Sequence, residues 1–239
     1  MTRVAIVQPN YLPWKGYFDL IHDVDVFLHY DDVQYTVRDW RNRNRIKTAQ
    51  RSAWLTIPVG ADRNRLIRDV EVPGFAWQAS HWESMRHAYA KAPYFQMFRD
   101  YFEWFFLGNT WTNLSELNRH LVEHIAREWL GVKTSFGLAS DFGVTSAKQE
   151  RIVDLLRATN ADLYVSGPSA RAYLDESKFR EEGIELVWKD YTGYPEYPQF
   201  HPPFEHEVSI VDLLFQTGDN APWYIWGWRE NGAPPAQIA

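Results

Sequence analysis

Two neighbouring carboxylates, Asp31 and Asp32, end an apolar run over residues 24–30, and Tyr35 follows them closely. One carboxylate could take a proton from an attacking amine or hydroxyl as a general base. The pair could also hold Mg²⁺ against a diphosphate. The alternative is structural, because an Asp-Asp pair after a strand commonly caps the next element. The spacing of these residues alone favours neither interpretation.

Arginine and asparagine alternate over residues 41–45. In an extended chain, alternate side chains share a face, so the arginines would gather on one face and the asparagines on the other. Guanidinium groups bind phosphate through paired hydrogen bonds, which suits a diphosphate-bearing donor such as a sugar nucleotide or coenzyme A. A solvated edge strand protected by charge is the alternative. The alternation and the adjacent tryptophan favour phosphate recognition, with these candidate residues: Arg38, Trp40, Arg41, Arg43, Asn44 and Arg45.

A polar and aromatic loop, residues 8–17, follows the first apolar run of the chain. Polar groups at the carboxyl end of a strand are how open α/β sheets build ligand sites. We expect Gln8 to hydrogen-bond a ligand, Lys15 to meet its phosphate, and Asn10 or Tyr11 to orient an acceptor. The alternative is a Pro-rich turn whose aromatic side chains simply pack.

A second small-residue turn comprises Ser166, Gly167 and the residues up to Arg171. A strand that opens onto a helix exposes backbone N–H groups that favour an anion, and Arg171 would add a charge. A tight strand–helix turn explains the glycine and the proline equally well.

Two further groups are weaker candidates. The segment from His120 to His124 matches His-x-x-Glu-His, a zinc-protease pattern, but no third ligand is evident and an ordinary amphipathic helix is favoured, so we assign no metal ligand. Around a Pro-rich loop, side chains suited to stack on a sugar ring could form a lid, although plain packing explains them as well: Tyr191, Tyr194, Tyr197, His201 and His206.

The elements that must position these groups predict a Rossmann-like parallel α/β sheet in one domain, residues 1–239. Short β-branched runs indicate strands at 3–8, 24–30, 53–59, 67–72, 162–166 and 184–188, with 53–59 and 67–72 forming a hairpin or an edge. Apolar residues at helical spacing predict a helical insertion over about 78–130 that stops at Gly131.

The second half of the chain repeats the strand–helix–strand order of a parallel sheet. A capping box at Ser146 predicts a helix to about 159. Further helices are expected from Gly167 through Phe179 and over 207–217, and an irregular tail over about 218–239.

Composition limits the function classes. The net charge is −6, which argues against a general nucleic-acid binder. Cysteine is absent, so disulfides and cysteine nucleophiles are excluded. The first residues lack a signal peptide, and no run of 18 apolar residues occurs, so we expect a soluble, cytoplasmic protein that does not enter membranes. A homodimer is left open.

Three phrases of the sequence resemble the WbqC-like family: VAIVQPNYLPWKGYFDLI, VDVFLHYDDVQYTVRDWRNRNRIKT and ADLYVSGPSARAYLDESKFREEGIELVWKDY. The resemblance covers nearly the whole chain and implies a context of O-antigen or other surface-polysaccharide assembly. It also favours the functional interpretation of Asp31 and Asp32. The chain has a weaker likeness to nucleotidyltransferases with the HIGH signature, which carry His-x-Gly-His between the first strand and first helix. Only Gly16 matches here, because Trp14 and Tyr17 replace the two histidines.

Together these features predict a transferase that modifies a nucleotide-linked amino sugar, with acyl or aminoacyl transfer to an amine as the specific hypothesis. Asp31, Asp32, Asn10 and Tyr11 are the candidate catalytic residues. The cofactor stays open between Mg²⁺ with a nucleotide and a coenzyme A donor. The alternatives are a nucleotide-dependent ligase or nucleotidyltransferase of the HIGH group, and a noncatalytic sugar-nucleotide-binding protein.

Overall fold

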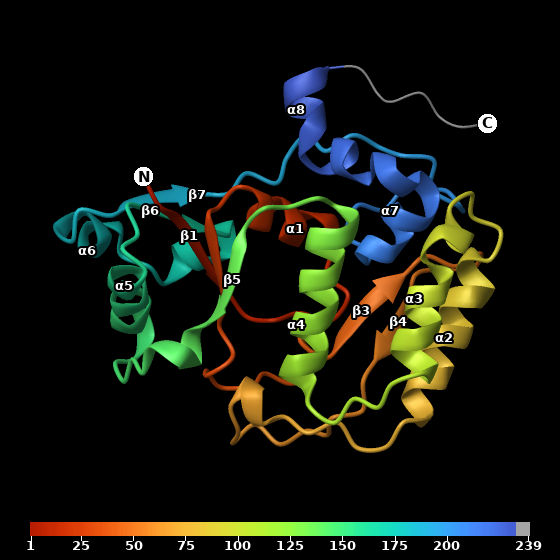
Figure 1. Cartoon of the computed structure of the whole chain (residues 1–239), viewed down its shortest axis with the longest axis horizontal. Coiled ribbons are helices and arrows are strands. Elements are labelled where there is room, and N and C mark those ends of the chain that lie inside the picture. Colours follow the sequence, from red (N-terminus) through yellow and green to blue (C-terminus); the bar gives the residue numbers. More distant parts are fainter. Residues whose placement is uncertain (233–239) are drawn as a thin grey trace.

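Five parallel strands form the central sheet of the computed structural model, which describes residues 1–232 (Figure 1). In spatial order they are β5 (Ser135–Leu138), β2 (Val26–His29), β1 (Arg3–Val7), β6 (Leu163–Ser166) and β7 (Glu185–Trp188). The chain builds outward from β1 to β2 and β5, then returns to the other side of β1 for β6 and β7. This order gives the predicted Rossmann-like sheet, with its switch point between β1 and β6.

Both faces of the sheet are covered around β1 and β2, which explains why these strands are apolar runs. The edge at β7 is more open, since Val187 is exposed and lines a cavity of about 500 Å³ with Arg3 and Leu163. Alternate residues of β1 enter two different cores: Ala5 belongs to one, whereas Val4 and Ile6 belong to the other. The core of Val4 and Ile6 is closed by α5 (Lys148–Ala158) and α6 (Glu176–Glu181). The larger core is closed by α1 (Lys15–His22), the helical segment and α7 (Ile210–Thr217).

The helical segment lies between β4 and β5, close to the predicted bounds. It comprises α2 (Ala76–Tyr89), α3 (Phe95–Leu107) and α4 (Leu114–His124), and α4 continues into a π-helical turn over Ile125–Trp129. Gly131 follows in the left-handed conformation, with φ of +67°, where glycine is favoured as a helix stop.

A separate antiparallel hairpin pairs β3 (Arg43–Ile46) with β4 (Ala53–Thr56). In Figure 1 it lies between α4 and the α2–α3 pair. The predicted strand over 53–59 is therefore confirmed in its first half, and its partner is β3. The prediction of a strand over 67–72 was wrong. Ile67–Asp69 form a 3₁₀ turn, and Glu71 makes only an isolated bridge to Asn113.

The second half of the chain departs from the predictions in three places. Helix α5 begins at Lys148, so Ser146 is not its cap; the Ser146 hydroxyl instead donates to Asp154 Oδ2 at 2.6 Å. The helix expected from Gly167 to Phe179 is a 3₁₀ turn over Pro168–Ala172 followed by α6. Helix α7 begins at Ile210, and the side chain of Ser209 caps it.

The tail predicted to be irregular from residue 218 is helical where the structure describes it. Turns over Gly218–Asn220 and Trp223–Gly227 lead into α8 (Trp228–Asn231). Tyr224 and Ile225 are buried in the larger core, and this burial orders the segment. The remainder of that prediction, residues 233–239, lies outside the described residues. None of the helices within residues 1–232 has the length and apolar character needed to cross a membrane.

Candidate functional site

A cavity of about 680 Å³ opens at the carboxyl ends of β1, β6 and β7, at the switch point of the sheet. This is the place where open α/β sheets bind ligands, and the volume is typical of small-molecule sites. The lining comes from the loops after these strands and from the segment around β3: Asn10, Pro13, Trp14, Trp40, Asn44, Pro168, Ser169, Tyr191, Thr192, Gly193, Tyr194, His206 and Glu207.

The loop after β1, residues 8–14, is held against the hairpin by backbone and amide contacts. The backbone N–H of Tyr11 donates to Trp40 O at 2.9 Å. The buried Asn44 amide donates to Leu12 O at 2.8 Å and to Tyr11 O at 3.2 Å. These bonds bring the first loop and the hairpin, which are distant in sequence, to one side of the cavity.

A second amide supports the same junction from α4. Asn118 is fully buried and donates to Arg41 O at 2.7 Å and to Pro9 O at 3.3 Å. The Tyr17 hydroxyl donates to Gln8 O at 3.1 Å from α1. Gln8 therefore contributes its backbone to the loop, and its side chain is not part of the cavity lining.

The opposite wall is the closing loop, residues 189–207, and two buried carboxylates hold it. Asp19 accepts from the Tyr194 hydroxyl at 2.6 Å and pairs with Lys189 at 2.9 Å. Asp212 accepts from the Tyr197 hydroxyl, also at 2.6 Å. Because both carboxylates are buried with hydrogen-bonded partners, the closing loop is fixed in place as part of the wall.

The predicted arginine face forms with two of its three members, because β3 begins at Arg43 and leaves Arg41 outside the strand; this face lies beside the cavity. Arg43 and Arg45 both lie over the Trp54 ring, with Cζ-to-centroid distances of 4.3 and 5.7 Å. Asn44, on the other face of β3, bonds the first loop and lines the cavity. Arg45 also donates to the backbone oxygen of Glu207, a lining residue, at 2.9 Å. Trp40 contacts Trp54, with ring centroids 5.6 Å apart.

The other two arginines of this group point elsewhere. Arg41 pairs with Asp39. Arg38, with φ of +56°, lines a separate cavity of about 420 Å³ together with Asn42 and Arg63.

Asp31 and Asp32 lie at the end of β2 and are not in the cavity lining. Asp32 pairs with Arg151 of α5, and both side chains are largely buried. Asp31 is buried beside Ser115, whose hydroxyl lies 3.4 Å from Asp31 Oδ2, and burial raises the pKa of the Asp31 carboxyl. Tyr35 is buried under Arg65, whose Cζ lies 5.2 Å from the ring centroid.

Tyr11 and Lys15 are also buried behind the lining. The Tyr11 hydroxyl bonds His81 Nδ1 at 2.9 Å. The Lys15 ammonium lies 4.9 Å from the Tyr194 ring centroid and 5.4 Å from that of Tyr197, and burial lowers its pKa to about 8.

The turn after β6 contributes to the cavity through residues next to the predicted ones. Pro168 and Ser169 line it, whereas Ser166 is buried in the sheet. Gly167 precedes them, and its backbone extends from the strand into the turn. Arg171 lies over the Trp188 ring at 5.3 Å.

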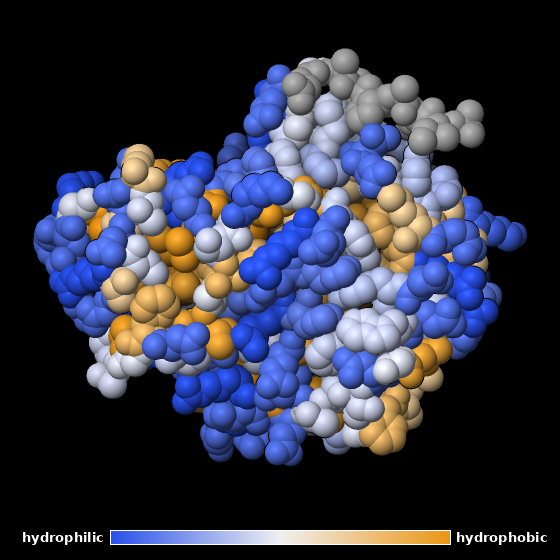
Figure 2. All heavy atoms as spheres, in the orientation of Figure 1, coloured by the Kyte–Doolittle hydropathy of each residue, from blue (hydrophilic) through white to orange (hydrophobic). Residues whose placement is uncertain are grey.

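The His-x-x-Glu-His pattern lies on an ordinary helix face. His124 stacks on Tyr101 with ring centroids 3.8 Å apart, and Glu123 pairs with Arg127 at 3.0 Å and with His29 at 3.4 Å. Figure 2 shows a band of hydrophilic side chains over α4. Stacking and ion pairing therefore account for this motif.

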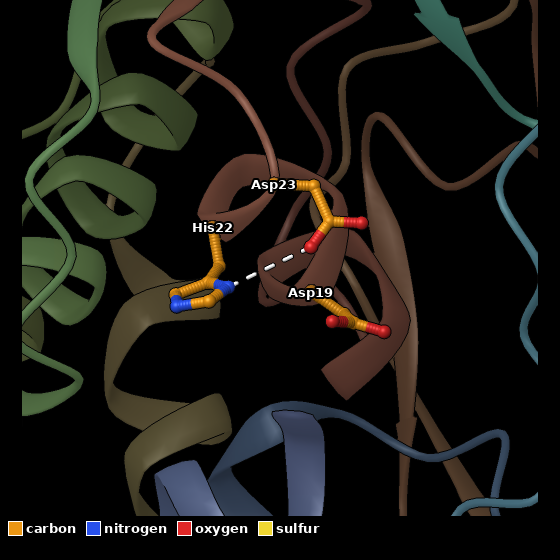
Figure 3. Close-up of side chains that lie close together, drawn as sticks. All are labelled: Asp19, His22 and Asp23. Carbon is orange, nitrogen blue, oxygen red and sulfur yellow. Dashed lines mark ion pairs between the residues drawn. The ribbon is translucent and has the colours of Figure 1, made fainter. Parts of the chain in front are cut away.

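Within residues 1–232, Asp19, His22 and Asp23 form the one group with three metal-ligand atoms close together (Figure 3). Asp19 already pairs with Arg229 and Lys189, and Asp23 accepts from Lys189 Nζ at 2.5 Å. Protein cations thus occupy the positions that a metal would take. Asp31 and Asp32 belong to no such group of three among these residues, and Asp32 is paired with Arg151.

Sequence reasoning assigned three residues that do line the cavity: Asn10, Trp40 and Asn44. It left the closing loop as an undecided lid, although Tyr191, Tyr194 and His206 all line the cavity. Its density of aromatic and proline residues was the available signal, but nothing local in the sequence indicates that this loop meets the first loop across the switch point.

Residues 8–224 match the family model described as "WbqC-like protein family". The chain is also 46% identical over 227 residues to the uncharacterized protein Rv1507c of Mycobacterium tuberculosis (strain ATCC 25618 / H37Rv), an alignment covering 94% of this chain and 98% of the relative. No solved structure matches the chain at a significant level.

Proposed function

Because this chain belongs to the WbqC-like protein family, and its main cavity lies at the sheet switch point, we propose that it is a transferase acting on a nucleotide-linked amino sugar. The family resemblance supplies the context of surface-polysaccharide assembly. The specific reaction proposed is acyl or aminoacyl transfer to the amine of the sugar.

The observation that carries the proposal is the composition of the cavity wall. Four aromatic side chains, Trp14, Trp40, Tyr191 and Tyr194, line it together with the amides of Asn10 and Asn44. Aromatic faces stack on the apolar faces of sugar rings and on nucleobases. The Asn10 Oδ1 atom is buried without a hydrogen-bond partner among the described residues, and a sugar hydroxyl or amine could donate to it.

The arginines of the hairpin offer positive charge for a diphosphate beside the cavity. Trp54 holds the guanidinium groups of Arg43 and Arg45 on the same face of the hairpin. Two lining residues connect this face to the cavity, since Trp40 contacts Trp54 and the Glu207 backbone accepts from Arg45. In the proposal, a ligand with its sugar among the lining rings extends its diphosphate past Trp40 toward these charges. Guanidinium forks suit this group better than ammonium groups.

Transfer to an amine fits a chain that has no cysteine. The amine can attack the carbonyl carbon of an activated acyl donor directly, so no covalent acyl-enzyme intermediate is required. Nucleotidyl transfer by the HIGH mechanism has less support, because the Tyr17 hydroxyl is committed to Gln8 O and Trp14 offers a ring in place of an imidazole.

Thermal denaturation with a ligand panel tests the proposal. The panel is UDP-, GDP- and dTDP-linked amino sugars, coenzyme A thioesters, ATP and CTP. We expect stabilisation by at least one nucleotide-linked amino sugar, since a ligand that binds only the folded state raises the melting temperature. Stabilisation by ATP or CTP alone would favour the ligase alternative, and no stabilisation by any ligand would contradict the proposal.

An arginine variant tests the orientation of the ligand. Arg43→Ala should weaken binding of the diphosphate ligand by about tenfold or more, whereas Arg86→Ala on the distant helix α2 should not change it. Unchanged affinity in Arg43→Ala would remove this residue from the site.

A further inference from the structure

His206 lies in the cavity wall at the end of the closing loop, and its ring packs against Phe204 with centroids 4.6 Å apart. His206 is the one histidine among the described residues that line the cavity. Its Nδ1 atom is buried and has no hydrogen-bond partner within residues 1–232. The ring therefore has a nitrogen that no described protein group uses.

Lys15 lies behind the same wall. Its ammonium is 5.8 Å from the Phe204 ring centroid, so one phenyl ring contacts both the ammonium and the imidazole. The Lys15 side chain is almost fully buried, and its nearest acceptor is Pro195 O at 3.4 Å. No carboxylate of the described residues forms an ion pair with this ammonium within 4.0 Å. Burial has the larger effect and lowers its pKa, while Asp212, Asp19 and Glu196 act on it from farther away and raise that pKa. Its charge therefore acts on nearby groups from a buried position, where Coulomb interactions are stronger than in water.

This arrangement favours the neutral form of the His206 ring. Burial lowers the pKa of His206, and the charge of Lys15 lowers it further. Glu196 and Glu207 act in the opposite direction, but Glu207 is paired with Arg45 at 3.4 Å. The net effect of these groups is a lowered pKa of His206, so its imidazole is neutral near pH 7 and able to accept a proton.

We propose that His206 is the catalytic base that takes the proton from the attacking amine, and that Lys15 is a positioning residue that keeps its ring neutral. This inference rests on the transferase function proposed above and names the proton acceptor in the same cavity. With an acyl thioester as the donor, the amine nitrogen forms a bond to the carbonyl carbon and the carbon–sulfur bond breaks. The proton lost by the nitrogen passes to the His206 ring and then to the departing thiolate, giving an amide and a free thiol.

The assignment replaces the carboxylates that the sequence suggested. Asp32 is neutralised by Arg151, and Asp31 is buried beside Ser115 outside the lining. A base must come within hydrogen-bond reach of the proton that it removes. The described residues that line the cavity include four titratable side chains, His206, Glu207, Tyr191 and Tyr194. Glu207 is committed to Arg45, and burial raises the pKa of both tyrosine hydroxyls, which leaves His206 as the base.

A titration of the side chains by NMR tests the charge state without any assumption about the reaction. The His206 resonance is assigned by its loss in His206→Gln. We expect the imidazole to titrate below the usual histidine range in the wild type, and at higher pH in Lys15→Met. An ordinary or raised value in the wild type, or no change in Lys15→Met, would overturn the role given to Lys15 and His206.

Kinetics on the amino sugar that stabilises the wild type, with an acyl thioester as donor, test the chemistry. We expect His206→Gln to lower kcat by about 100-fold or more with little change in KM. Lys15→Met should retain turnover with its acidic pH limb moved to higher pH. The control is His87→Gln, an exposed residue of α2, which should behave as the wild type.

The two proposals fail differently. A wild type that turns over while His206→Gln keeps the same kcat and pH profile would overturn the inference and leave the transferase function standing. A wild type that binds no nucleotide-linked sugar, or binds it without turnover, would overturn the transferase function and with it the catalytic role of His206.

Discussion

The side-chain amide of Asn44 lies 2.8 Å from the carbonyl oxygen of Leu12. This bond joins the middle of the arginine hairpin to the loop that follows the first strand. Leu12 itself has φ of +41°, a conformation that is costly for a branched side chain and persists only where the surroundings fix it. The cavity wall therefore depends on a buried amide of the β3–β4 hairpin, outside the central sheet.

Asn44→Ala should destabilise the protein and release the first loop from the hairpin. Removing the amide leaves the carbonyl oxygens of Tyr11 and Leu12 without this donor, at a cost of about 1–3 kcal/mol. Urea denaturation measures the free energy of unfolding, and the control Asn64→Ala changes an exposed side chain. A variant as stable as the wild type would show that the first loop does not need this clamp.

Gly16→Ala should disturb the cavity without removing any lining group. A Cβ at residue 16 would overlap the Trp14 ring, so that ring must leave its position in the wall. Affinity for the nucleotide-linked sugar should fall by about tenfold, even though alanine is the better helix former by about 1 kcal/mol.

The matched control is Gly227→Ala, since a Cβ there would meet no atom closer than 3.6 Å. Equal affinity in Gly16→Ala and the wild type would mean that the Trp14 ring does not contact the ligand.

Asp32→Ala should act on stability and leave turnover intact. The Arg151 side chain is only 13% exposed, and removing its partner leaves a buried charge uncompensated, which costs about 3–5 kcal/mol. Asp69→Ala removes an exposed carboxylate and should cost less than about 1 kcal/mol. Loss of turnover in a stable Asp32→Ala protein would restore the catalytic role that the sequence suggested.

Acid should destabilise the fold through His81. Burial lowers the pKa of His81 to about 4, so between pH 6.5 and that value the unfolded chain binds a proton that the folded chain excludes. The neutral ring contributes fully to the free energy of unfolding above pH 6.5. This contribution falls as the pH drops toward 4, by about 3 kcal/mol in total.

Urea denaturation at pH 7 and pH 4.5 measures this loss. His81→Gln should show a smaller difference between the two pH values, while His87→Gln on the exposed face of α2 should match the wild type. The same acid loss in His81→Gln and the wild type would assign it to other groups.

Local patterns predicted the parallel sheet because its inner strands β2, β1 and β6 are short apolar runs that are largely buried. The strand β5 gave no such signal, since Ser135–Leu138 is a four-residue edge strand that contains a glycine. The segment 67–72 carried the pattern of a strand but has no ladder partner, and only tertiary pairing separates these cases.

The candidate site was predictable only where local patterns mark it. The strand ends located Asn10, and the alternation located the arginine face. The pairing of Asp32 with Arg151 joins residues more than a hundred positions apart. So does the contact of Trp14 in the first loop with Tyr191 and Tyr194 in the closing loop. Such contacts follow from the topology of the sheet and leave no trace in local periodicity.

Photo-crosslinking with an azido-substituted nucleotide-linked amino sugar, followed by mass mapping of the labelled peptides, tests the central claim most directly. We expect label in the first loop (residues 8–14), around Trp40 and in the closing loop, and its loss when unlabelled ligand competes. Competed label confined to the band of hydrophilic side chains over α4, or competed label on none of these segments, would contradict a ligand site at the switch point.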